Sequence, residues 1–260
     1  MQDETGQAMP LAGPDFPPAR GRVDALDLAR TFALICMAIY HFTYDLEMFG
    51  YVAPYTAVTG GWAIFARMIA GSFLFMAGIS LYLAHGCGIR WRPFLRRFGV
   101  LVLAAALITA VTRQAMPETY IFFGILHSIA VASLLGLAFL RLPSWMTLAV
   151  AALIVFGRST LSATGFFDAP VLAGLGLTSW SVRSADFVPV FPWFAATLAG
   201  IAFARIAGAR GLWQHLARSA GATGRWRRAL VWPGRHGLTV YLLHQPVLIS
   251  ALWVFARLTR

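Results

Sequence analysis

Four ionisable residues share the first long apolar segment: Asp27, Arg30, His41 and Asp45. Arg30 and His41 are eleven residues apart, which on an α-helix is three turns plus about 20°, so both side chains lie on one face. Asp27 and Asp45 extend this face by about one turn at each end. Ionisable groups within such a segment usually mark function, here a general base, His41, whose ring Asp45 orients. The alternative is a packed helix whose polar groups satisfy one another.

Five residues further along the chain are weaker candidates for a cavity. His127 and His244 lie inside apolar segments, where each is either functional or hydrogen-bonded to a neighbouring helix. His236 begins the last segment, at a position where interfacial solvation would suit it. Asp186 and Trp193 flank two prolines at the start of another segment. Asp186 would cap that helix or face a cavity, and Trp193 would be an interfacial aromatic; taken alone, these residues favour the structural roles.

The segments that carry these residues are long and apolar enough to cross a bilayer. Of the 260 residues, 59% are hydrophobic and 12% charged, whereas soluble domains average about 45–50% apolar and about 25% charged residues. This composition excludes a water-soluble globular fold. With about 20 residues needed for a span, the sequence predicts seven, the fifth of them short: 28–49, 62–84, 98–112, 119–140, 145–156, 190–207 and 238–256.

The predicted fold is therefore all-α, a polytopic membrane helix bundle of about seven spans. Residues 159–180 are rich in glycine and contain Asp168 and Pro170, which predicts an outer loop or a re-entrant segment, with an eighth helix as the alternative. The bundle would occupy residues 23–260. Residues 1–22 are polar and proline-rich, which indicates a disordered cytoplasmic tail.

The net charge of +11 is distributed as a topology signal. All 21 cationic residues are arginines, and fourteen fall in loops on one side of the predicted spans against five on the other. The positive-inside rule therefore places the N-terminus in the cytoplasm. Arginines that flank successive spans do not form one nucleic-acid footprint, so no nucleic-acid partner is expected. The inner arginines Arg90, Arg92, Arg96 and Arg97 would anchor this topology, which we favour, or bind phosphates.

Six short motifs, in order along the chain, resemble one family. They are RVDALDLAR (22–30), MAIYHFTYDL (37–46), FMAGIS (75–80), FGILH (123–127), VFPWF (190–194) and GRHGLTVYLLHQP (234–246). Together they resemble the heparan-alpha-glucosaminide N-acetyltransferase catalytic-domain family in its shorter bacterial form. The arginine followed eleven residues later by histidine is also similar to the hallmark of the wider transmembrane acyltransferase superfamily. In that superfamily an acyl-CoA binds from the cytoplasm and an acceptor sugar receives its acyl group.

The resemblance implies a catalytic base at His41 and a donor-positioning role for Arg30. It also supports Asp45, His127 and His244 as cavity residues, and it implies acyl-CoA, foremost acetyl-CoA, as co-substrate with no metal. Two features depart from the animal lysosomal enzymes, which have more spans and carry a histidine in the loop after the first helix. Residues 50–61 contain no histidine, so the expected acceptor is a glycan or lipid-linked sugar rather than heparan sulfate.

The function expected from the sequence is an integral membrane acyltransferase that modifies a hydroxyl or amine, in the bacterial inner membrane. Two alternatives stay open. A proton-coupled transporter or export partner would use Arg30, His41 and Asp45 as a proton relay. A noncatalytic membrane scaffold would need the same residues only for stability.

Overall fold

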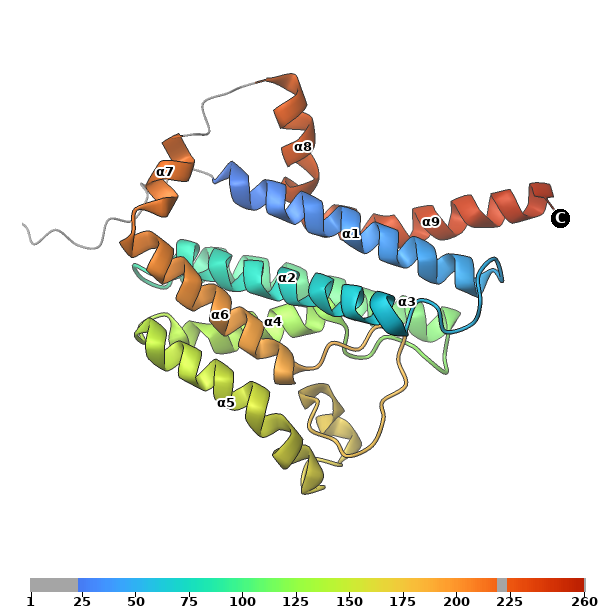
Figure 1. Ribbon diagram of the computed structural model, residues 1–260, viewed down its shortest axis with the longest axis horizontal. Coiled ribbons are helices and arrows are strands. Elements are labelled where there is room, and N and C mark those ends of the chain that lie inside the picture. Colours follow the sequence, from blue (N-terminus) through green and yellow to red (C-terminus); the bar gives the residue numbers. More distant parts are fainter. Residues whose placement is uncertain (1–22, 219–223, 260) are drawn as a thin grey trace, which may run out of the picture.

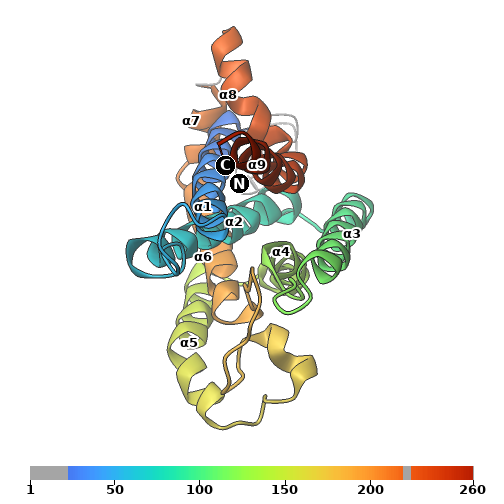
Figure 2. The same ribbon diagram turned by 90° about the vertical axis from the view of Figure 1, so that its right-hand side faces the viewer.

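The computed structural model describes residues 23–218 and 224–259, and over these ranges it contains helices and no strand. The tail predicted at residues 1–22 lies outside this part. Six helices are long and apolar enough to cross a membrane: α1 (Asp24–Met48), α2 (Gly60–His85), α3 (Trp91–Ala115), α5 (Ser144–Ala163), α6 (Val190–Ala209) and α9 (Gly237–Thr259). A shorter apolar helix, α4 (Ile125–Gly136), continues into the 3-10 turn η1 (Leu137–Phe139). The predicted polytopic helix bundle is confirmed, and its long helices run side by side (Figures 1 and 2).

Three predicted spans have different lengths in the structure. The third, predicted at 98–112, is helix α3, which begins at Trp91 and carries Arg92, Arg96 and Arg97 in its first turns. The fourth, predicted at 119–140, begins as a helix only at Ile125, because the backbone of the preceding residues is hydrogen-bonded to the segment before α6. The fifth, predicted to be short at 145–156, is the full-length helix α5. Residues 159–180 therefore begin inside α5, and the rest is a loop with one 3-10 helix, η2 (Pro170–Leu175), so no eighth span forms there.

Two short helices occupy a stretch that the sequence analysis treats only as a cytoplasmic loop. They are α7 (Leu212–Arg218) and α8 (Arg225–Arg235). Both are too short to cross a bilayer, and α8 alternates arginines with large apolar residues. Figure 1 shows α8 crossing α1 near one end of the bundle.

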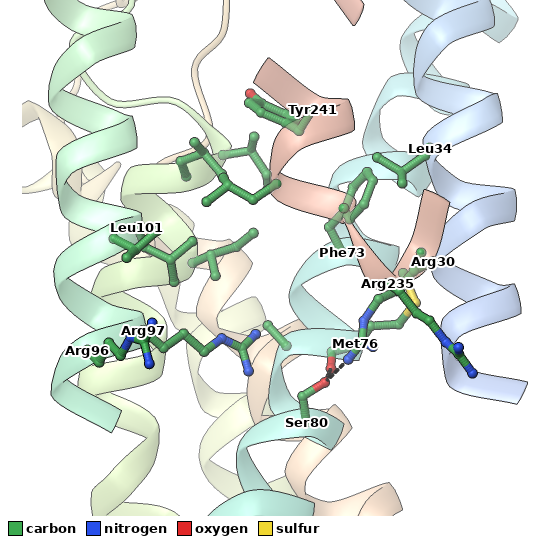
Figure 3. Close-up of a pocket in the computed structure, with 18 of the residues that line it drawn as sticks. Arg30, Leu34, Phe73, Met76, Ser80, Arg96, Arg97, Leu101, Arg235 and Tyr241 are labelled. Carbon is green, nitrogen blue, oxygen red and sulfur yellow. Dashed lines mark hydrogen bonds between the residues drawn. The ribbon is translucent and has the colours of Figure 1, made fainter. Parts of the chain in front are cut away.

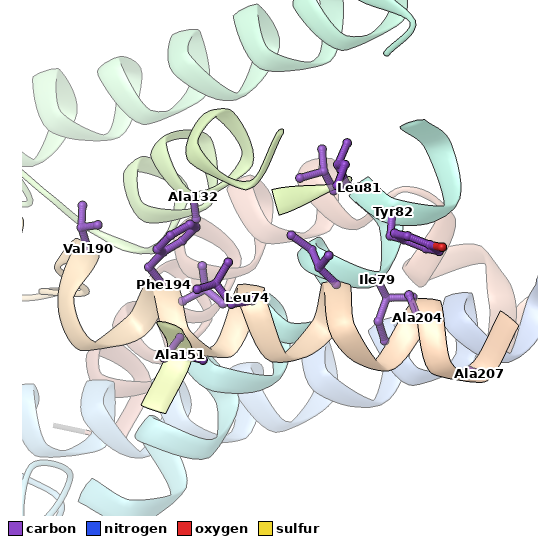
Figure 4. Close-up of a cluster of buried hydrophobic side chains, with 14 of the residues drawn as sticks. Leu74, Ile79, Leu81, Tyr82, Ala132, Ala151, Val190, Phe194, Ala204 and Ala207 are labelled. Carbon is purple, nitrogen blue, oxygen red and sulfur yellow. The ribbon is translucent and has the colours of Figure 1, made fainter. Parts of the chain in front are cut away.

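The scaffold of the bundle is the close pair α2 and α6. Small residues allow it: a Cβ on Gly78 would lie 2.1 Å from the Thr197 carbonyl oxygen, and one on Gly200 would lie 2.1 Å from the Phe75 carbonyl oxygen. Such small-residue contacts let membrane helices approach closely. Leu74 of α2 is fully buried in the hydrophobic cluster at this contact (Figure 4). Helices α1 and α4 pack on α2, and α4 and α5 pack on α6, whereas α3 packs on α4 and α9 packs on α1.

The irregular backbone before α4 is held by hydrogen bonds to the segment that precedes α6. The Ala185 N–H donates to the Thr119 carbonyl at 2.8 Å, and the Val188 N–H donates to the Phe123 carbonyl at 3.1 Å. On α3, the Thr109 hydroxyl donates to the Ile121 carbonyl at 2.7 Å. Non-helical backbone at membrane depth requires such internal partners, because lipid offers none. The two segments therefore form one hydrogen-bonded unit at the predicted outer end of α4.

Candidate active site

The N-terminal half of α1 carries a buried ion pair. Asp27 is only 1% exposed, and its Oδ1 accepts a hydrogen bond from Arg30 Nη1 at 2.7 Å. Arg30 Nη2 donates to the Ser80 hydroxyl of α2 at 2.5 Å. Because the guanidinium is held from two helices, its position is fixed against the α1–α2 contact.

Helix α8 closes on the same part of α1. A Cβ on Gly234 would lie 1.9 Å from the Asp27 carbonyl oxygen, so only glycine permits this crossing. The Thr31 hydroxyl donates to the Leu230 carbonyl at 2.8 Å and accepts the Gly234 N–H at 2.9 Å. These contacts bring Arg235 into ion pairs with Asp24 at 2.9 Å and Asp27 at 3.5 Å.

A cavity of about 770 Å³ opens beside this ion-pair cluster. Five arginines from α1, α3 and α8 line it: Arg30, Arg92, Arg96, Arg97 and Arg235. Apolar side chains continue the lining beyond the arginines, among them Leu34, Phe73, Leu101, Leu126 and Leu238. Tyr241 of α9 lies at the opposite end from the arginines (Figure 3). The volume falls in the range of small-molecule and cofactor sites, about 300–1,000 Å³.

The five arginines divide into two groups. Arg30 and Arg235 are paired with Asp27 and Asp24. Arg92, Arg96 and Arg97 of α3 form no ion pair with any carboxylate in residues 23–218 and 224–259. Figure 3 shows the Arg97 side chain extending from α3 across the cavity toward Ser80. The α3 arginines therefore leave positive charge uncompensated in the cavity, which favours an anionic ligand.

The C-terminal half of α1 faces α9 through a histidine pair. The rings of His41 and His244 are 4.9 Å apart, centroid to centroid. His41 lies about 16 Å from Arg30 along the helix, at about 1.5 Å per residue. Tyr241, which lines the cavity, stands one turn before His244 on α9. The histidine pair thus follows the apolar end of the cavity.

Asp45 does not orient His41, contrary to the prediction. It is fully buried, and its Oδ1 accepts a hydrogen bond from Gln245 Nε2 of α9 at 2.6 Å. Its Oδ2 has no hydrogen-bond partner among the described residues. Helix spacing alone places Asp45 one turn from His41, but Gln245 on the neighbouring helix supplies the stronger contact. Asp45 therefore fixes α1 to α9 next to the histidine pair.

The hydrogen bonds determine the tautomers of two neutral histidines. His244 Nδ1 lies 2.5 Å from the Tyr241 carbonyl, which can only accept, so Nδ1 carries the proton. Its buried Nε2 then keeps a lone pair, with no partner in the described part of the chain. In His127 the Gly124 N–H donates to Nδ1 at 3.2 Å, so Nε2 carries the proton, 3.3 Å from the Thr109 hydroxyl. Both ring nitrogens of His127 have hydrogen-bond partners. This matches the structural alternative for His127, a histidine held by hydrogen bonds to its neighbours.

The other predicted cavity residues lie elsewhere, and neither they nor His127 line the arginine cavity. Asp186 Oδ2 accepts the Ile125 N–H at 3.0 Å, so it caps α4 rather than α6. Burial raises the pKa of the Asp186 carboxyl from 3.8 to about 6, opposed by that hydrogen bond. Trp193 packs into the core against Gly71. His236 is exposed and bonds the Trp232 carbonyl at 3.0 Å.

Three residues that the sequence analysis did not single out belong to the site: Ser80, Tyr241 and Gln245. Gln245 directly follows His244 inside an apolar segment, and a polar residue at such a position could have marked it as a candidate site residue. Ser80 and Tyr241 could not be recognised in this way, because serine and tyrosine are common within membrane spans. Among the residues the structure covers, no three His, Cys, Asp or Glu side chains gather as metal ligands.

Comparison with known proteins identifies the family. The family model described as heparan-alpha-glucosaminide N-acetyltransferase, catalytic, matches residues 22–246. This range contains the α1 charged face, the α3 arginines and the α9 histidine. Neither the curated proteins nor the solved structures include a match to this chain. With most of its length matched, the chain belongs to the heparan-alpha-glucosaminide N-acetyltransferase catalytic family, an acetyltransferase family, and is a multi-pass membrane protein.

Proposed function

We propose that the protein transfers an acetyl or similar acyl group from acyl-CoA to a hydroxyl or amine of a glycan or lipid-linked sugar. The observation that carries this proposal is the continuity of the site. The cavity is lined by five arginines and by apolar side chains, and it reaches Tyr241. His41 and His244 are not among its lining residues, but Tyr241 stands one turn before His244 on α9, beside the His41–His244 pair. The arginines suit the phosphates of CoA, and the apolar walls suit its extended thiol arm. The predicted topology makes the arginine end cytoplasmic, where acyl-CoA is available, and favours the bacterial inner membrane.

The His41 imidazole acts as the general base in this proposal. It removes the proton from the acceptor oxygen or nitrogen, which attacks the thioester carbonyl carbon. The new C–O or C–N bond forms, the C–S bond breaks, and CoA leaves as the thiol once it has taken up a proton. His244 packs beside His41 and presents the unprotonated Nε2 toward the same buried region, so it is placed to share the proton.

Acetyl transfer by the purified protein tests the proposal. The protein in lipid nanodiscs is given acetyl-CoA with an extract of cell-envelope glycans and lipids, and both CoA release and acetylated product are measured. We expect His41→Ala to lower turnover by about 10²- to 10⁴-fold, the usual contribution of a general base. The matched control is His236→Ala, an exposed histidine outside the cavity. Equal turnover in all three proteins would sink the assignment of His41.

Binding of acetyl-CoA separates this proposal from a proton-coupled transporter. Calorimetry should give saturable affinity in the wild type and in His41→Ala, because the base is separated from the phosphate-binding arginines by about 16 Å of helix. A transporter that uses the same residues as a proton relay would show no saturable affinity for CoA.

A further inference from the structure

Helix α8 has three distinct faces along its length. Arg227, Val231 and Gly234 face α1: the first pairs with Asp24 and the other two are buried. A second face, at helical spacing, consists of Trp226, Ala229, Leu230 and Pro233, which we call the apolar stripe. The third consists of Arg225, Arg228, Arg235 and the exposed Trp232; we call its three arginines the basic stripe. The first face packs on α1, and Arg235 at the end of the third face pairs with Asp24 and Asp27.

The apolar stripe is open to the surroundings although it contains large side chains. Trp226 is 75% exposed and Leu230 57% exposed. At about 100° per residue, Leu230 and Arg228 point about 160° apart around the helix axis. A helix with arginines on one side and tryptophan and leucine on the other is typical of helices that lie in the membrane interface.

The placement of α8 fits that interpretation. The helix crosses α1 beside Asp27 and Thr31, at the arginine end of the bundle. Figure 1 shows it running away from the bundle, across the direction of the spanning helices. Its free faces therefore extend sideways from the protein at the level where α1 enters the membrane, which is where headgroups and acyl chains meet.

We propose that α8 is a membrane-binding helix of the cytoplasmic leaflet that recognises anionic lipid. The apolar stripe inserts among the acyl chains, and Arg225 and Arg228 contact anionic headgroups. Charge complementarity favours this occupant over zwitterionic lipid, since each arginine near an anionic surface adds to binding.

Lipid binding by α8 has a direct consequence for the cavity. The helix ends in Arg235, which lines the cavity and holds Asp24 and Asp27. Gly234 and Leu230 fix the same turn to α1 through Thr31. Anchoring α8 in anionic lipid therefore stabilises the arginine end of the cavity, and acetyl-CoA should bind more tightly in anionic bilayers. This consequence, unlike the lipid binding itself, rests on the proposed function.

Fluorescent labels on opposite sides of α8 test the lipid contact. In a full-length background with Cys36→Ala and Cys87→Ser, bimane is attached to Leu230→Cys or, as the matched control, to Arg228→Cys. The protein is placed in nanodiscs containing brominated lipid. We expect bromolipid to quench the label at position 230 and aqueous iodide to quench the label at position 228. Iodide quenching of both labels, or equal bromolipid quenching of both, would overturn the proposal.

Bilayer composition tests the preference for anionic lipid. Bromolipid quenching at position 230 should increase when phosphatidylglycerol replaces part of the phosphatidylcholine, and Arg225→Gln with Arg228→Gln should abolish that increase. An increase that survives both substitutions would overturn the headgroup assignment. Acetyl-CoA affinity is measured in the same nanodiscs. If acetyl-CoA does not bind in any of them, the proposed function fails, whereas the quenching results still decide the lipid contact.

Discussion

Replacing Arg97 with glutamine tests whether the α3 arginines act on phosphate. Arg97 lines the cavity, and within residues 23–218 and 224–259 it has no carboxylate partner. Its charge is therefore available to a ligand without first breaking an ion pair. One hydrogen bond to a charged group contributes about 1.5–3 kcal/mol. Its loss should weaken acetyl-CoA binding by about 10- to 150-fold, at 1.4 kcal/mol per tenfold change.

The same substitution should not destabilise the ligand-free protein. Five arginines line one cavity, so removing one charge reduces repulsion among those that remain. We therefore expect the thermal midpoint of Arg97→Gln without ligand to equal or exceed that of the wild type. A residue needed only for folding would give the opposite result, a lower midpoint with unchanged affinity.

Calorimetric titration with acetyl-CoA in nanodiscs, at low and physiological salt, measures the effect. Arg141→Gln is the matched control: it removes an arginine in the turn between α4 and α5, outside the cavity. We expect it to bind acetyl-CoA within about twofold of the wild type. If Arg97→Gln also binds within twofold, or if both variants weaken binding equally, the assignment of phosphate binding to the cavity is wrong.

Three further predictions concern the structure around the site. Gly200→Ala should destabilise the bundle by about 1–3 kcal/mol, because its Cβ would lie 2.1 Å from the Phe75 carbonyl oxygen. The matched control is Gly157→Ala, where a Cβ would meet open space, and it should stabilise α5 by up to about 1 kcal/mol. Similar thermal midpoints for the two variants would contradict the close packing of α2 against α6 at Gly200. Gln245→Leu should lower the free energy of unfolding, measured with chemical denaturant, by about 1–3 kcal/mol, because it leaves Asp45 without its hydrogen bond. Adding Asp45→Leu should recover part of this loss. No recovery in the double variant would show that the two residues act independently. Folding stability should fall by on the order of 2 kcal/mol as pH rises from about 4 to about 6, because the folded protein keeps the Asp186 proton up to a pKa of about 6 and the unfolded chain releases it near 3.8. Asp186→Asn should flatten that pH profile, and an unchanged slope in the variant would exclude Asp186 as its source.

The spanning helices were predictable because apolar length is a local property of the chain. Helices α1, α2, α3, α6 and α9 match predicted spans within a few residues at most ends. The ends of the fourth and fifth spans were mispredicted, because hydropathy carries no information on whether a residue's backbone bonds within a helix or to another segment. Residues before Ile125 are apolar enough for a helix, yet they bond to the segment before α6. Helix α8 was missed because a short amphipathic helix and a basic loop have the same composition.

Side-chain contacts within one helix were predictable from residue spacing, whereas contacts between two helices were not. Helix periodicity correctly placed Asp27 beside Arg30, which the structure joins at 2.7 Å. It wrongly placed Asp45 on His41, because the partner of Asp45, Gln245, is 200 residues away in the sequence. The unpaired state of Arg97 was likewise beyond prediction, since it depends on which carboxylates fold nearby.

The short helix α4 has a consequence for how an acceptor reaches the site. With η1 it covers Ile125–Phe139, about 22 Å at about 1.5 Å per residue, whereas the hydrocarbon layer is about 30 Å thick. The remaining depth is filled by the hydrogen-bonded loops, and Ile125, the first residue of α4, already lines the cavity. The low-dielectric barrier between the cavity and outer water is therefore thinner along α4 than the membrane itself. Under the proposed function, a hydrophilic sugar that approaches there would lose less hydration than one that has to enter lipid, while the thioester would stay on the far side of the apolar walls.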